Sequence, residues 1–121
     1  MLLIKEFEFD SAHFLPKYKG KCEALHGHTY KLVVKLEGHP HGEECMIMDF
    51  VEFKDIVKKE VVDVLDHTCL NDILPQSSAE NIVVWIWQKL EGPLKRENCK
   101  LFEVELWETR TSGVVYRGEK L

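Results

Sequence analysis

Three histidines near the N-terminus have the spacing of a metal site. His26 and His28 stand two residues apart at the start of a predicted strand, within the stretch KGKCEALHGHTY. Successive side chains of a strand point to opposite faces, so both imidazoles face the same side. His13 has the parity of the apolar side chains in an earlier strand, so pairing of the two strands could bring three imidazoles together. Three neutral histidines with an open fourth position are typical of a catalytic zinc site.

Histidine pairs also occur without a metal. An H-x-H pair alone can be the polar end of a strand, and His13 is what favours the metal interpretation here. A second pair, His39 and His41, lies in GHPHGE among glycine and proline residues, with no third ligand in view. We predict that this second pair lies in a solvated turn.

Cys22 is the first candidate for proton transfer. It precedes His26 by four residues, in a loop that carries three lysines. Nearby cations and a metal lower the pKa of a thiol and favour the thiolate. The alternative is a loop thiol that only packs against its neighbours.

Asp66 and His67 form a second candidate, at the end of a predicted helix in LDHTCLND. An imidazole beside a carboxylate can transfer protons near neutral pH. The alternative is a histidine whose cation is favoured at a helix C-terminus, with Asp66 on the surface.

Glu108 is the carboxylate with the most informative position. In LFEVELWET it shares parity with Phe102, Val104 and Leu106, at the end of the more apolar face. An ionised group there is costly unless it has a partner, and a ligand with paired N–H donors would provide one. The alternative is a residue at a strand end that reaches solvent.

Alternating apolar and polar residues predict the strands that must position these side chains. These strands span residues 3–10, 28–37 and 101–108, with a last one in GVVYR from 113. A further short strand is predicted in CMIMDF at 45–50.

Two amphipathic helices separate the early strands from the late ones. The first begins at the capping-box pattern DFVE (49–52) and the second at SSAE (77–80), before a stop at Gly92-Pro93. The leading strands are too close together for crossover helices, which predicts an antiparallel sheet. The expected architecture is therefore α+β, one domain over 1–121 with two helices on one face of the sheet.

Composition narrows the class of protein. The 121 residues include 16 Lys and Arg against 21 Asp and Glu, a net charge of −5, which argues against a nucleic-acid or membrane-surface binder. The start MLLIKEFEF meets charge too early for a signal peptide, and no apolar run could span a bilayer. We therefore expect a cytoplasmic protein with reduced cysteines.

The chain resembles the 6-pyruvoyltetrahydropterin synthase and 6-carboxytetrahydropterin synthase family in six motifs, in the family's order. These are FEFDSAH, CEALHGHTY, MIMDF, LDHTCLND, SAENIVVWI and WETRTSGVVY. The resemblance implies the tunnelling fold, in which sheets of several subunits join into a barrel with the helices outside. It also implies a homo-oligomer of trimers that stack into hexamers, with pockets at subunit junctions.

The same resemblance implies roles for individual residues. Zn²⁺ would be the cofactor, acting as a Lewis acid on the substrate side chain. Its ligands would be His13, His26 and His28. The catalytic residues would be the base Cys22 and the proton-relay pair Asp66 and His67, often supplied by a neighbouring subunit. The substrate-binding residues would be Glu108, which grips the guanidine-like edge of a pterin, with Thr109 and Glu23.

The implied substrate is 7,8-dihydroneopterin triphosphate, and the local pattern bears on the product. The spacing C-x-x-x-H-G-H resembles the queuosine branch of the family, which makes 6-carboxytetrahydropterin with acetaldehyde and triphosphate. Glu23 occupies the glutamate position of a folate-linked branch that makes 6-hydroxymethyl-dihydropterin. The alternatives are therefore the folate product, the 6-pyruvoyl product, or a zinc- and pterin-binding oligomer without catalysis.

Overall fold

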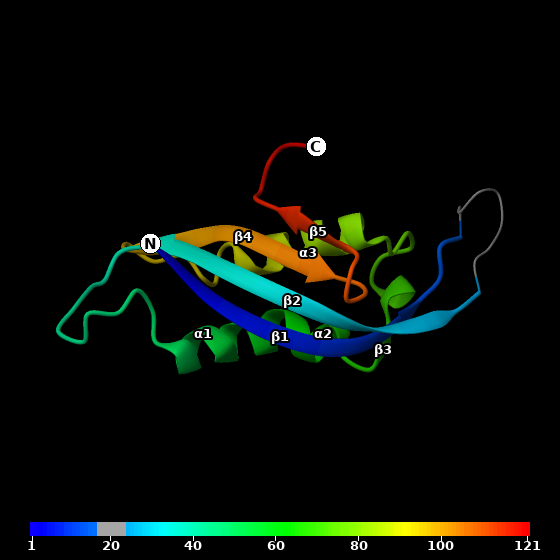
Figure 1. Cartoon of the computed structure of the whole chain (residues 1–121), viewed down its shortest axis with the longest axis horizontal. Coiled ribbons are helices and arrows are strands. Elements are labelled where there is room, and N and C mark those ends of the chain that lie inside the picture. Colours follow the sequence, from blue (N-terminus) through cyan, green and yellow to red (C-terminus); the bar gives the residue numbers. More distant parts are fainter. Residues whose placement is uncertain (17–23) are drawn as a thin grey trace.

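The computed structural model describes residues 1–16 and 24–121, in which five strands form one mixed sheet (Figure 1). The strands lie in the order β3-β1-β2-β4-β5. Their bounds are β1 (Leu2–His13), β2 (His26–Gly38), β3 (Thr68–Cys69), β4 (Cys99–Trp107) and β5 (Gly113–Tyr116). All neighbours pair antiparallel except β3, which runs parallel to β1 over two residue pairs. The expected antiparallel sheet is thus confirmed for its four longer strands, and β3 was not predicted.

The helices pack against one face of this sheet. The first helical run comprises α1 (Phe50–Val57), the π-helical turn η1 (Lys58–Val62) and α2 (Asp63–Leu65). After a 3₁₀ turn, η2 (Leu70–Asp72), helix α3 (Ala79–Leu90) lies behind β4 and β5 (Figure 1). This is the predicted α+β architecture. No helix in the described part of the chain is long and apolar enough to cross a membrane.

The core lies between the helices and the apolar sides of β1, β2 and β4. Phe9 and Tyr30 stand opposite each other in register and stack with ring centroids 5.0 Å apart. Leu32, Val34 and Leu36 continue the same side of β2 and are fully buried. The predicted alternation of β2 is therefore confirmed, and its apolar side faces the helices.

The π-helical turn has a simple cause in the spacing of the apolar residues. The most buried side chains of the first helical run recur every four residues, at Phe53, Val57, Val61 and Leu65. On a regular α-helix such a spacing drifts by about 40° a step, because one turn takes 3.6 residues. A wider turn in the middle of the run offsets this drift and keeps the stripe on the core.

Two sequence expectations about strands were wrong. Residues 45–50 form no strand, because only Met46 bridges back to His41 before the helix begins. In β4, the pairing with β2 shifts register between Lys35 and Leu36, so Leu101 rather than Phe102 lies in the core. Val104 and Leu106 keep their predicted side, and Glu108 follows them at the end of the strand.

The helix starts agree with the sequence in one case and differ by a residue in the other. Asp49 caps α1, accepting hydrogen bonds from the backbone N–H groups of Val51 and Glu52. The cap of α3 is Ser78, which accepts from the Asn81 N–H, so the capping box expected from Ser77 to Glu80 does not form. Ser77 is instead fully buried.

The Asp49 cap makes a stability prediction. Replacing Asp49 with Ala should lower the free energy of unfolding by about 1 kcal/mol, because two N–H groups of the first turn lose their acceptor. Asp49→Asn should retain most of that energy, since its amide oxygen can accept the same bonds. Urea denaturation would measure both, and equal losses in the two variants would contradict the capping role.

Candidate metal centre

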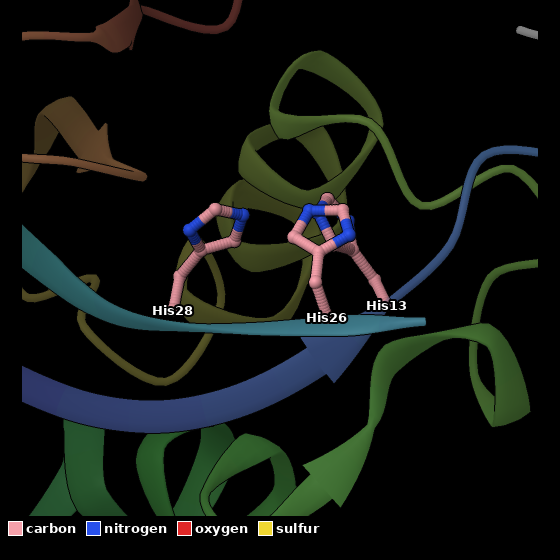
Figure 2. Close-up of side chains that lie close together, drawn as sticks. All are labelled: His13, His26 and His28. Carbon is pink, nitrogen blue, oxygen red and sulfur yellow. The ribbon is translucent and has the colours of Figure 1, made fainter. Parts of the chain in front are cut away.

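His13, His26 and His28 converge at one end of the β1–β2 pair. His13, the last residue of β1, pairs in register with His26, the first residue of β2. Their ring centroids are 4.7 Å apart, and that of His28 lies 5.2 Å from His13 and 4.7 Å from His26. Figure 2 shows the three side chains on the same side of the strands. The structure therefore brings together the three histidines that the sequence singled out.

Hydrogen bonds determine which ring nitrogens of two of these histidines face the centre. His13 Nδ1 lies 2.8 Å from the carbonyl oxygen of Ser77, and His26 Nδ1 lies 2.9 Å from that of Ala24. A carbonyl only accepts, so both Nδ1 atoms carry the proton. In the neutral rings both Nε2 atoms then present lone pairs.

Those two lone pairs face each other at short range. The Nε2 atoms of His13 and His26 are 3.1 Å apart, which is unfavourable unless a proton or a cation lies between them. Ligands about 2.0–2.1 Å from a tetrahedral zinc ion are about 3.3 Å from each other. One ligand nitrogen from each of the three histidines lies within 4.8 Å of the other two, so the donor set fits a divalent cation that keeps one position open.

Glu108 adds a negative charge to the same place. Its Oε1 lies 3.5 Å from Nε2 of His28, and its Oε2 lies 3.8 Å from Nε2 of His13. The Glu108 side chain is 30% exposed to solvent. A carboxylate beside the imidazole cluster further favours a bound cation, and it leaves an acceptor available to a ligand.

Tyr30 forms the buried side of the cluster. Its ring centroid lies 5.6 Å from that of His28, and its hydroxyl has no hydrogen-bond partner among the described residues. Burial, and next the charge of Glu108, raise the pKa of the Tyr30 phenol well above its usual value. The hydroxyl therefore stays neutral, and Tyr30 contributes no negative charge to the site.

Thr109 lies beside Glu108 in the turn that follows β4. Its hydroxyl oxygen accepts hydrogen bonds from the backbone N–H groups of Thr111 and Ser112. The N–H groups of Glu108 and Thr109 both donate to the Ser112 carbonyl. The turn thus gives Thr109 a structural role and holds the Glu108 backbone at the end of the strand.

Asp66 and His67 form a separate cluster at the edge of β1. Asp66 Oδ1 accepts the Asp10 N–H at 2.8 Å, and Oδ2 lies 2.9 Å from Nδ1 of His67. The Asp10 N–H holds the pKa of the Asp66 carboxyl below its usual value, and the His67 ring adds to this. His67 has a φ of 58°, and its N–H donates to the Asp10 carbonyl, so backbone strain is held beside this pair.

The two clusters do not share a face of the sheet. Asp10 joins Asp66 and His67 in one group of ligating atoms, and its exposed side chain points opposite to the buried His13 by strand alternation. His67 is exposed and lines an open cavity of about 520 Å³ together with Asp10, His28 and Thr29. Of these three, only Asp10 brings a ligating atom close to His67 and Asp66. The remaining predicted residues, Cys22 and Glu23, lie outside the described part of the chain.

Sequence reasoning missed the residues that orient the histidines. The sequence pattern places Ser77 in a capping box, whereas in the structure its carbonyl accepts a hydrogen bond from His13, 64 positions away. No local pattern signals a backbone carbonyl that binds a distant ring.

Known proteins resemble nearly the whole length of the chain. The model of the 6-pyruvoyl tetrahydropterin synthase family matches residues 2–119. The 6-carboxy-5,6,7,8-tetrahydropterin synthase of Haemophilus influenzae is 33% identical over 93% of this chain and 96% of its own length. The dihydroneopterin monophosphate aldolase of Pyrococcus furiosus is 37% identical over 93% of each chain. The solved structure of Caenorhabditis elegans 6-pyruvoyl tetrahydropterin synthase superposes with a TM-score of 0.83, at 23% identity over 98% and 96% of the chains, and shares the fold.

Metal binding can be predicted directly from the cluster. Chelator-treated protein should bind one Zn²⁺ or Co²⁺ per chain, and His26→Ala should weaken binding by about 100-fold or more because a ligand is lost. His41→Ala is the matched control, since His41 belongs to the exposed H-x-H pair. Competition with a chromophoric chelator would measure the affinities. Binding by His26→Ala that equals the unmodified protein would refute the site.

Proposed function

The chain belongs to the 6-pyruvoyl tetrahydropterin synthase family, and on this premise we propose that it is a zinc-dependent lyase of dihydropterin triphosphates. The substrate would be 7,8-dihydroneopterin triphosphate. With one water molecule it yields 6-carboxy-5,6,7,8-tetrahydropterin, acetaldehyde and triphosphate. This reaction would serve queuosine or 7-deazapurine biosynthesis in the cytoplasm.

One observation carries the proposal: two histidine lone pairs face each other beside a third imidazole and a carboxylate. Such a donor set binds a cation and leaves room for a further ligand. Zinc held there would act as a Lewis acid on the substrate's side-chain hydroxyls. The chain's own residues supply the remaining chemistry.

Glu108 would bind the substrate next to the cluster. Its carboxylate is half-buried and close to the imidazoles, and it can accept N–H or O–H groups of a bound pterin. Tyr30 would form the core side of the site and keep water out there, because its ring is fully buried. Thr109 would assist by holding the turn that carries Glu108.

Proton transfer would require a thiol or carboxylate and the Asp66–His67 pair. Cys22 would take a proton from the substrate side chain as the general base. His67 would exchange a second proton with the substrate. Asp66 Oδ2, 2.9 Å from Nδ1 of His67, would orient the ring and stabilise its protonated form. Because His67 lies on the side of the sheet opposite to His13, we propose that a neighbouring subunit brings its own Asp66 and His67 to this cluster.

A homo-oligomer would meet this requirement. Sheets joined edge to edge into a barrel would place the β3–β1 edge of one subunit, with its Asp66 and His67, beside the sheet of the next. The expected assembly is a trimer or a hexamer. The substrate is a small molecule, and neither nucleic acid nor membrane is required.

Glu23 favours a second candidate, the formation of 6-hydroxymethyl-dihydropterin. The sequence carries Cys22 and Glu23 side by side, and one relative is named as an aldolase of dihydroneopterin monophosphate. A carboxylate base at this position would redirect proton removal to another bond of the side chain. A bifunctional enzyme would form both products.

Product analysis tests the activity. Metal-loaded protein incubated with 7,8-dihydroneopterin triphosphate should form 6-carboxytetrahydropterin, and chelator should abolish turnover. Cys22→Ala should abolish this product, and Glu23→Ala should spare it. Mass spectrometry would identify the products. No turnover by metal-loaded protein would leave a non-catalytic binding protein, and full activity of Cys22→Ala would refute its role as base.

Mixing of inactive subunits tests the shared site. His26→Ala removes a metal ligand and His67→Ala removes the proton relay, so each variant alone should be inactive. In a random 1:1 mixture about a quarter of the sites should be active, because the histidine cluster must come from a His67→Ala subunit and the relay from a His26→Ala subunit. Activity after joint refolding would measure this. Mixtures that stay inactive would show that one chain supplies both clusters.

A further inference from the structure

The orientation of His13 depends on a carbonyl group that belongs to a distant loop. His13 is 1% exposed, and its Nδ1 donates to the Ser77 carbonyl, just before α3 begins. The position of this carbonyl therefore decides where Nε2 points. Residues that hold Ser77 act on the metal centre without touching it.

Asn71 joins the end of β1 through two hydrogen bonds that imitate a strand pairing. Its Oδ1 accepts the Phe14 N–H at 3.0 Å, and its Nδ2 donates to the Phe14 carbonyl at 2.9 Å. Phe14 directly follows His13. The side-chain amide thus extends the β1–β3 pairing past its last backbone pair, Ala12 with Cys69.

The same amide also holds the loop that carries the Ser77 carbonyl. Asn71 Nδ2 donates to the Pro75 carbonyl at 2.9 Å, and Oδ1 lies 3.0 Å from the Ser77 hydroxyl. That hydroxyl lies 3.2 Å from the Phe14 carbonyl as well, and shares its one proton between the two acceptors. Both N–H groups and both acceptor positions of Asn71 are therefore used.

We propose that Asn71 is the positioning residue of the metal centre. It ties Phe14 to the 75–77 loop, and so keeps the Ser77 carbonyl against Nδ1 of His13. This fixes the protonated nitrogen and the plane of the ring, and directs the Nε2 lone pair at the cation. The inference rests on the metal site of the proposed function, but not on the reaction or its product.

Asn98 is a matched control within the same chain. Its Nδ2 donates to the carbonyls of His39 and Ile47 at 3.0 and 2.9 Å, at the opposite end of β2. Asn71 and Asn98 are both half-buried and both join backbone segments through one amide. Loss of either should destabilise the fold, whereas only Asn71 should affect the metal centre.

Cobalt binding provides the test. Asn71→Ala should weaken Co²⁺ binding by about 10–100-fold and change the visible absorption of bound Co²⁺, because the ring loses its fixed orientation. Asn98→Ala should leave both unchanged. Binding should be measured well below the unfolding temperature of each variant, which circular dichroism would determine.

Two gentler changes keep the test informative where Asn71→Ala does not fold. Asn71→Asp keeps the shape and loses the donors to Phe14 and Pro75, so it should weaken Co²⁺ binding by a similar factor. Ser77→Ala keeps the carbonyl and loses only the hydroxyl contact, so its effect should be smaller. Imidazole ¹⁵N chemical shifts of the metal-free variants would report mixed tautomers of His13.

The outcomes separate this inference from the proposed activity. Unmodified affinity and spectrum in the Asn71 variants would overturn it, as would equal changes in Asn98→Ala. Absence of Co²⁺ binding by the unmodified protein would also overturn it. Normal Co²⁺ binding without turnover would refute only the proposed reaction.

Discussion

The antiparallel register between β1 and β2 is the constraint on which both the core and the metal centre depend. The same pairing places Phe9 opposite Tyr30 and His13 opposite His26. A slip of one residue would turn the apolar side of a strand away from the helices, so burial specifies this register strongly. Apolar burial thus brings the imidazoles together before any cation binds.

Apolar burial fixes which residues of β1 and β2 lie opposite each other, and hydrogen bonds then determine the orientation of the histidine rings. The carbonyls of Ser77 and Ala24 turn the Nδ1 protons of His13 and His26 outward, which leaves lone pairs facing each other. An apolar core alone has no such directional preference. The polar contacts around η2 and the α3 cap therefore orient the metal centre as well as stabilise the fold.

The alternation of the strands divides the chemistry of the chain between two faces. The histidine cluster lies on the side that the helices cover, and Asp66 with His67 lies at the β1 edge beside the exposed side. In the proposed assembly each chain thus offers two half-sites. A pocket shared in this way could hold the proposed pterin triphosphate although one chain has only 121 residues.

The sequence by itself determined the elements with strong periodicity and the residues that they carry. The parity of His13, His26 and His28 followed from the period of two in a strand, and Asp49 was identified as a cap from its local pattern. The buried side of β2 followed in the same way. These features depend on residues a few positions apart, so they are readable without a structure.

The tertiary structure decided the features that depend on contacts between distant segments. The register shift in β4, the pairing of β3 with β1, and the links from Asn71 to Phe14 and Ser77 to His13 join residues up to 64 positions apart. The same is true of the separation of His67 from the histidine cluster. A side chain's partner at that range is set by the path of the folded backbone, and no local spacing of residue types records that path.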